Sequence, residues 1–147
     1  PETLLINAGE RFQPLAQQQN ITLLIDVPKQ LLEPVYSDYQ RVEQILAIFM
    51  DNAFNYTPPE GTIRLAVRET PHVTTFMVED SGPGIPPSQR ERIFERFFRA
   101  DDSRTEKEHY GLGLSFALSL AELLHASLQV TDSTLGGACF QINLKRK

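Results

Sequence analysis

The stretch IFMDNAFNYT (residues 48–57) decides how this chain folds, because it has the pattern of a buried helix that polar side chains interrupt. Asn and Asp are mediocre helix formers, since their side chains compete for backbone hydrogen bonds. Helical periodicity separates the residues of this region into two neighbouring stripes. The apolar stripe, which we expect to be buried, contains Val42, Leu46, Phe49, Ala53 and Tyr56. The second stripe contains Ile48, Asn52 and Asn55, so Asn52 is expected at the edge of the packed face, pointing into a cleft.

This central helix has recognisable ends. Ser37 or Asp38 can cap its N-terminus through a side-chain oxygen. Tyr56 is its expected last turn, because Pro58 and Pro59 follow and proline cannot continue a helix.

The segments on either side of this helix also show regular patterns. A helix is predicted over residues 3–19, and Pro14 is expected to bend or restart it. Alternating apolar residues predict a strand over residues 20–28. Two further strands, at residues 62–69 and 73–80, are joined by a tight connection.

The C-terminal half alternates loops with regular elements. Residues 81–87 are expected to form a loop, residues 88–95 a short helix, and the polar residues 99–110 a flexible lid. A third long helix is predicted from Gly111 to about Leu124. Two strands, over residues 127–133 and 139–146, close the chain.

The order of these elements defines the fold class. Strands and helices partly segregate, and two strand pairs are hairpins, so we predict an α/β two-layer sandwich rather than a doubly wound parallel sheet. A mixed five-stranded sheet would pack on three main helices. Residues 1–147 are predicted to form a single domain, since 147 residues suffice for one substantial core.

Composition limits the partners. The net charge of −5 argues against duplex nucleic acid, which needs a basic face. The one cysteine, Cys139, excludes an internal disulfide and is expected to be a small buried residue in a reducing compartment. No apolar run approaches the roughly 18–20 residues that span a bilayer, and we expect the chain, which starts at Pro1, to be an excised piece of a longer protein.

Two motifs carry candidate ligand-binding side chains. The amide oxygen of Asn52 suits Mg²⁺, although a helix-end Asn bonded to nearby backbone is the simpler explanation of this residue alone. In EDSGPGIP (residues 79–86), an ionised Asp80 can accept a hydrogen bond from the amino group of adenine, and guanine has an acceptor at that position. Gly82 and Gly84 would let the backbone approach a flat ring. Taken alone, this short pattern is better explained by a plain Asp-Ser-Gly-Pro turn.

Two more motifs follow in the chain. YGLGLSFA (residues 110–117) places Gly111 and Gly113 at a helix N-terminus, where free amides and the helix dipole favour phosphate, although a tightly packed helix start would look the same. RIFERFFR (residues 92–99) supplies core aromatics, among them Phe97, that would also anchor the lid. Arg99 and Arg104 are then expected to reach phosphate.

Together, in this order, the motifs resemble the catalytic, ATP-binding domain of sensor histidine kinases over essentially the whole chain. This domain belongs to the Bergerat-fold superfamily shared with type II topoisomerase ATPase domains, heat-shock chaperones and mismatch-repair ATPases. Residues 44–58 look like the family's asparagine box, 79–86 and 111–117 like its two glycine boxes, and 93–99 like its phenylalanine box. LGGACFQINL (residues 135–144) looks like its final glycine-containing strand pair.

The resemblance implies ATP and Mg²⁺ as ligands, bound between the helices and the lid. Asn52 would bind the metal and Asp80 the adenine amino group, while Tyr56 and Ile85 would pack on the ring. The other residues that the resemblance assigns to the nucleotide site are Asn55, Gly82, Gly84, Phe97, Arg99, Arg104, Gly111, Leu112, Gly113 and Leu114. The γ-phosphoryl group would pass to a histidine of a partner domain, so no residue of this chain is assigned as a catalytic acid or base.

Two positions depart from the family pattern. Ile48 stands where the kinases usually have Asn and where the ATPase cousins carry a glutamate that activates water, so an ATPase is disfavoured. Asn55 stands where a basic residue is common, so weak nucleotide affinity is expected unless the lid arginines compensate. A degenerate docking module without kinase activity remains the alternative.

The resemblance also implies partners and a location. None of the three histidines (His72, His109 and His125) lies in the family's phosphoacceptor pattern, so the acceptor is expected on a separate dimerisation domain of the same protein. A response regulator is the further partner. We expect an isolated domain that is monomeric and makes no membrane contact, in the cytoplasm, with a parent protein anchored in a bacterial cell membrane.

Overall fold

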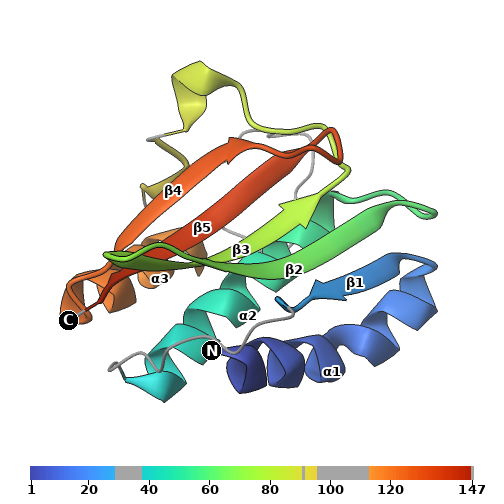
Figure 1. Ribbon diagram of the computed structural model, residues 1–147. Coiled ribbons are helices and arrows are strands. Elements are labelled where there is room, and N and C mark those ends of the chain that lie inside the picture. Colours follow the sequence, from blue (N-terminus) through green and yellow to red (C-terminus); the bar gives the residue numbers. More distant parts are fainter. Residues whose placement is uncertain (29–37, 91, 96–112, 147) are drawn as a thin grey trace.

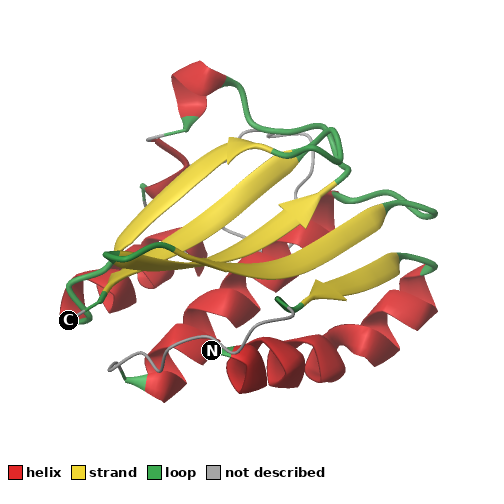
Figure 2. Cartoon of the chain, viewed as in Figure 1, coloured by secondary structure: helices red, strands yellow, loops and turns green. Residues whose placement is uncertain are grey.

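The computed structural model describes residues 1–28, 38–90, 92–95 and 113–146, and it forms two layers. Three long helices, α1 (Glu2–Gln19), α2 (Tyr39–Tyr56) and α3 (Gly113–Leu123), lie on one face of a five-stranded sheet (Figure 1). Figure 2 shows the same separation of helices and strands by colour. The predicted α/β two-layer sandwich is therefore confirmed.

The sheet is mixed, as predicted, and its order explains how distant segments meet. Its strands are β1 (Thr22–Asp26), β2 (Thr62–Glu69), β3 (Val73–Asp80), β4 (Ser127–Asp132) and β5 (Ala138–Lys145). In space they follow the order β1-β2-β3-β5-β4. β1 pairs with β2 in parallel, and every other pairing is antiparallel. β5 therefore lies beside β3, although more than fifty residues separate them in the chain.

The core lies between the helices and the sheet. From β2, Ile63 and Leu65 point into it and are fully buried. Phe49 of α2 contacts Phe140 of β5, with ring centroids 5.4 Å apart. Such an aromatic pair stabilises the core beyond the contribution of the large apolar area that each ring buries. The packing of α2 on β3 and β5 holds the site-bearing end of this helix against the sheet.

The opposite, outer face of the sheet is largely polar, with a small buried cluster of Ala66, Met77 and Cys139. Cys139 is buried as predicted. Burial, and then the negative charge of Glu79, raise the pKa of its thiol. The thiol therefore stays protonated and packs as a small apolar group.

Helix α2 agrees closely with its predicted pattern. Its apolar stripe is buried, from Val42 to Ala53, and Tyr56 is half-buried at its end. Asp38 caps the N-terminus by accepting hydrogen bonds from the amides of Gln40 (3.1 Å) and Arg41 (3.3 Å).

One local prediction was wrong, and another was narrowed. Of the two effects expected at Pro14, a restart of the helix is excluded, because α1 runs through the exposed proline, and buried residues on both sides of it, Phe12 and Ala16, hold the helix against the core. The segment 88–95 forms two short 3-10 helices, Pro87–Gln89 and Arg92–Phe94, rather than one helix. Only Ile93 is buried among the described residues of these turns, too little to stabilise an α-helix of this length.

Among the described residues, no helix is long and apolar enough to cross a membrane.

The cap at Asp38 provides a test of the fold. Replacing Asp38 by Ala leaves two amides of the first turn without their partner and should lower the free energy of unfolding by about 1 kcal/mol. Asp38→Asn is the matched control, because Asn caps as well as Asp and should retain the stability. Urea unfolding of both variants measures the difference, and equal losses would contradict the capping role.

Candidate functional site

Asp80 is the central side chain of the candidate site. It ends β3 and lies on the helix-facing side of the sheet, where only 3% of it is exposed. Its Oδ1 accepts hydrogen bonds from the amides of Gly82 (2.9 Å) and Ala138 (3.2 Å). Its backbone oxygen accepts a further bond from the amide of Gly137 (3.1 Å). Asp80 is thus held by its own loop and by the start of β5.

These contacts give the carboxylate a particular electrostatic state. Burial raises the pKa of Asp80 above its usual value, and the amides of Ala138 and Gly82 partly oppose this rise. Within the described part of the chain, both hydrogen bonds to the carboxylate reach Oδ1. Oδ2 is consequently available to accept a hydrogen bond from a ligand.

Two glycines make the close approach around Asp80 possible. A Cβ on Gly82 would lie 2.8 Å from the backbone oxygen of Tyr56. A Cβ on Gly137 would clash with Asp80 Oδ1 and would lie 2.6 Å from its backbone oxygen. Real Cβ atoms do not approach so closely, so a side chain at either position would push the chain apart.

Gly137 is a residue of the site that sequence reasoning missed. It was expected only within the strand pair of residues 135–144, with no role at the pocket. Nothing in the local sequence reveals its contact with Asp80, because that contact depends on β5 pairing with β3. The paired glycines Gly136 and Gly137 indicate a turn at this place but not the residue that the turn contacts.

Gly84 has a different requirement. Its φ of +79° lies in the left-handed region, which glycine adopts without strain. The next residue, Ile85, is half-buried and packs against the core. Its backbone oxygen accepts a hydrogen bond from Arg90 Nε (3.2 Å), and Arg90 also pairs with Asp132 at 2.6 Å. Arg90 thereby ties the loop that carries Ile85 to the end of β4.

The edge stripe of α2 lies as predicted. Ile48, Asn52 and Asn55 are all half-buried, between the core stripe and solvent. The backbone of Tyr56 adjoins Gly82, which brings the end of α2 next to the Asp80 loop. The amide oxygen of Asn52 fits a magnesium ion that takes one protein ligand and fills its other positions with water and phosphate oxygens.

The start of α3 also reaches α2. A Cβ on Gly113 would lie 3.6 Å from Ile48 Cγ2, which is ordinary contact. Leu114 is half-buried and packs against the core. The atoms described around Gly113 therefore leave room for a side chain, whereas those around Gly82 and Gly137 do not.

Several predicted site residues lie outside the described residues: Phe97, Arg99, Arg104, Gly111 and Leu112. Their assignments stay predictions. The described ones come from three places, the end of α2, the loop after β3 and the start of α3.

Residues 37–147 match the family described as histidine kinase-, DNA gyrase B-, and HSP90-like ATPases, and the chain belongs to this family. Within it, the chain is of the sensor histidine kinase type, whose ATP-binding catalytic domain it resembles. It is 39% identical over 139 residues to the sensor histidine kinase TmoS of Ectopseudomonas mendocina. It is 36% identical over 146 residues to the adaptive-response sensory kinase SasA of Gloeothece citriformis.

These matches cover 92% and 96% of this chain but only 14% of TmoS and 35% of SasA. Among solved structures, full-length ShkA in complex with AMPPNP superposes with a TM-score of 0.83 at 28% identity, covering 99% of this chain and 30% of ShkA. The nucleotide-free catalytic domain of the histidine kinase ThkA superposes with a TM-score of 0.82 at 24% identity, covering 98% of this chain and 92% of that one, a likeness of fold.

The contact between Gly137 and Asp80 predicts a steep steric penalty. Gly137→Ala should lower the free energy of unfolding by roughly 2–3 kcal/mol, because its Cβ meets backbone atoms that cannot move aside easily. Gly113→Ala is the matched stability control, since its Cβ has room and Ala favours a helix over Gly. Urea unfolding compares the two, and equal stability of both variants would refute the steric requirement.

The raised pKa of Asp80 predicts how its substitution changes stability with pH. The folded state binds this proton more tightly than the unfolded chain, so the group's contribution is most favourable at low pH and is lost as pH rises through the raised pKa. Asp80→Asn should therefore unfold at the same or a higher temperature than the wild type near pH 7. That advantage should disappear as the pH falls towards the usual carboxylate range.

Glu79→Gln is the control for this experiment, because it removes the neighbouring carboxylate from an ion pair with Arg64 and should lose stability. Thermal unfolding across pH measures all three proteins. A lower midpoint temperature of unfolding for Asp80→Asn than for the wild type at pH 7 would show that the buried charge does not destabilise the fold.

Proposed function

We propose that this chain is the ATP-binding catalytic domain of a sensor histidine kinase, which binds Mg-ATP and donates the γ-phosphoryl group to a histidine of a separate dimerisation domain. The observation that carries the proposal is the buried Asp80, whose hydrogen bonds within the described part of the chain both reach Oδ1 and so leave Oδ2 for a ligand. Such a carboxylate accepts a hydrogen bond from the amino group of adenine and opposes the carbonyl of guanine.

The remaining described residues would place the rest of the nucleotide. Tyr56 and Ile85 would pack on the two sides of the adenine, next to the Gly82 loop. Asn52, one helical turn before Tyr56, would bind Mg²⁺ beside the phosphates. Magnesium would neutralise phosphate charge during transfer.

The phosphates would lie at the start of α3, where free amides and the helix dipole attract negative charge. In this proposal Gly111, Leu112, Gly113 and Leu114 form the helix start. Arg99 and Arg104 reach the phosphates from the lid, and Phe97 anchors its base. Asn55 adds a polar contact without charge, so affinity for nucleotide should be weak.

In the transfer step, the bond between the γ-phosphorus and its bridging oxygen breaks, a bond to a histidine nitrogen forms, and ADP leaves. This domain's own residues orient ATP and exclude competing water; none acts as acid or base. Ile48, beside Gly113, cannot activate water as a glutamate would, so transfer is favoured over hydrolysis.

The parent protein and its partners are part of the proposal. The acceptor histidine would belong to a dimerisation domain of the same protein, since His72 and His125 follow no phosphoacceptor pattern and are exposed outside α-helices. A response regulator would receive the phosphoryl group next. The solved complex of ThkA with the response regulator TrrA has a subunit of this fold, with a TM-score of 0.81 at 23% identity over 99% of this chain and 40% of ThkA.

We further propose that residues 1–147 act as a single monomeric domain in the cytoplasm. The parent protein would be anchored in a bacterial cell membrane. Neither nucleic acid nor the membrane is expected as a ligand of this domain, given the net charge of −5.

The decisive assay mixes this domain with the parent's dimerisation domain and γ-labelled ATP. The label should move to a histidine, and the phosphohistidine that forms should be stable to base and labile to acid. Association without transfer would favour the alternative of a docking module, to which Ile48 and Asn55 point. Many ATP turnovers by the isolated chain would instead indicate an ATPase.

The metal role of Asn52 predicts an effect that depends on magnesium. Asn52→Ala should weaken ATP binding by about tenfold with magnesium present, the value of one lost contact of about 1.4 kcal/mol, and hardly at all in EDTA. Asn7→Ala, on the exposed side of α1, is the control. Calorimetric titrations in both buffers measure the difference, and an equal loss in the two would exclude metal ligation.

A further inference from the structure

Glu79 and Asp80 are consecutive residues at the end of β3, and they face opposite sides of the sheet. Both hold the β4–β5 turn (residues 133–137), Asp80 from the helix side and Glu79 from the outer face. Glu79 is 7% exposed, unusually low for a glutamate on a sheet face that none of the described long helices covers. Specific neighbouring residues therefore bury this carboxylate.

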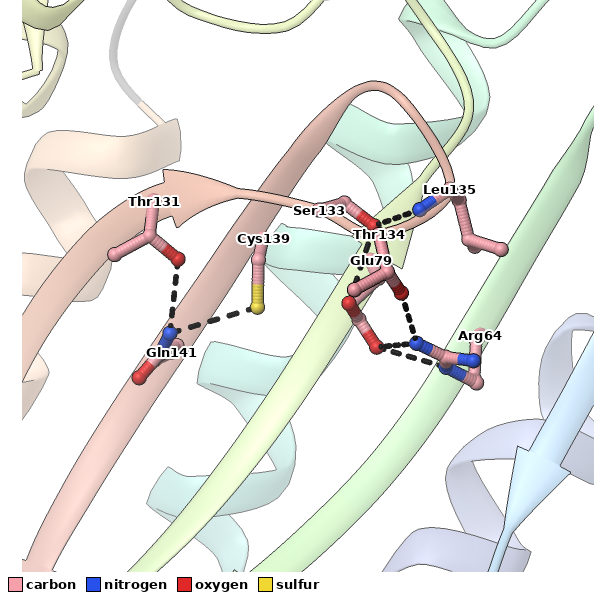
Figure 3. Close-up of polar contacts among 8 residues, drawn as sticks. All are labelled: Arg64, Glu79, Thr131, Ser133, Thr134, Leu135, Cys139 and Gln141. Atoms are coloured by element: carbon pink, nitrogen blue, oxygen red, sulfur yellow. Dashed lines mark hydrogen bonds and ion pairs between the residues drawn. The ribbon is translucent and has the colours of Figure 1, made fainter.

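The contacts of Glu79 use both carboxylate oxygens (Figure 3). Oε2 accepts from Arg64, at 2.7 Å from Nε and 2.6 Å from Nη2. Oε1 accepts from the hydroxyl of Ser133 (3.1 Å), and this hydroxyl accepts from the amide of Leu135 (3.0 Å). Arg64 Nη2 also donates to Thr134 Oγ1 (2.9 Å). Glu79 and Arg64 thus bind two successive residues of the turn, and the Ser133 hydroxyl binds a third, Leu135.

The turn passes this constraint on to Asp80. The amide of Ser133 donates to the backbone oxygen of Gly137 (2.8 Å), and the amide of Gly136 donates to that of Ser133 (3.0 Å). Gly137 and Ala138 then supply the two β5-side amides that hold the backbone and Oδ1 of Asp80. A shift of Ser133 therefore moves the donors that orient this carboxylate.

Stability alone is a weak explanation for an ion pair at this place. Replacing a buried ion pair by well-packed apolar residues is often neutral or stabilising. The same outer face already carries the apolar cluster of Ala66, Met77 and Cys139, against which an apolar side chain at position 79 would pack. The polar network is better explained by the β4–β5 turn that it holds in place.

We propose that Glu79, together with Arg64 and Ser133, is a positioning group for nucleotide selection: it fixes the β4–β5 turn so that Asp80 keeps Oδ1 on Ala138 and presents Oδ2 to the base. This inference rests on the proposed function. Glu79 itself does not contact the nucleotide in this account. Its effect reaches the base through Ser133, the turn and Asp80.

The test compares ATP with inosine triphosphate, which carries a carbonyl where adenine has its amino group. In Ser133→Ala and Glu79→Gln, the affinity for Mg-ATP should fall by about threefold to tenfold, the range for one weakened hydrogen bond. The affinity for Mg-ITP should stay nearly constant, so the ATP/ITP ratio shrinks. Ser133→Thr keeps the hydroxyl and should restore the ratio.

The matched control is Thr75→Val on the same outer face. It deletes the 2.7 Å hydrogen bond from Thr75 to Asn143, four residues along β3 from Glu79 and away from the turn. It should lower the melting temperature as much as Ser133→Ala does but leave the ATP/ITP ratio unchanged. Calorimetric titration, at a temperature where every variant is folded, supplies the ratios.

The outcomes separate the two levels of the proposal. Suppose that Ser133→Ala and Glu79→Gln keep the wild-type ATP/ITP affinity ratio while Asp80→Asn abolishes the preference for ATP. This result would overturn the positioning role and leave the proposed function intact. A wild-type domain that binds both nucleotides equally well, and is unaffected by Asp80→Asn, would overturn the proposed function and this inference with it.

Discussion

The hydrogen bonds that Asp80 accepts from its own loop and from the start of β5 are the interaction on which the site depends. A carboxylate that is 3% exposed is costly unless donors replace the water it has lost. Two amides do so at Oδ1, one from the loop after β3 and one from Ala138. The close contact requires Gly137 to have no side chain, and it leaves Oδ2 with hydrogen-bonding capacity for a ligand. The buried charge is thus kept at a cost to the fold, which is common for groups that select a ligand.

The order of the strands in the sheet brings the other site residues next to this contact. β5 pairs antiparallel with β3, so the end of β3 and the start of β5 meet at one edge. The end of α2 reaches the same edge, where the backbone of Tyr56 adjoins Gly82. The helix that carries Asn52 is held in place by core packing of Phe49 against Phe140. Packing in the core and polar contacts at the edge therefore place the candidate adenine and metal groups relative to one another.

The parts of this arrangement that depend on local pattern could be predicted from sequence. The spacing of apolar residues in α2, a cap at Ser37 or Asp38 and the two hairpins were all predicted, because each is encoded within one short segment. The wrong prediction concerns competition between propensity and packing, since the segment after Pro87 forms only 3-10 turns. The same competition lets α1 continue through Pro14 without a restart. The contacts of Gly137, Ser133 and Glu79 could not be predicted, because partners 54 to 58 residues apart meet only through strand order.

The central claim is that Asp80 reads the adenine amino group while Asn52 holds the metal. A crystal structure of this domain with Mg-AMPPNP tests it most directly. The account predicts Asp80 Oδ2 within hydrogen-bond distance of the adenine amino nitrogen, Oδ1 still on the amides of Gly82 and Ala138, and the Asn52 oxygen on magnesium. A nucleotide bound with its base away from Asp80, or magnesium held without Asn52, would contradict it.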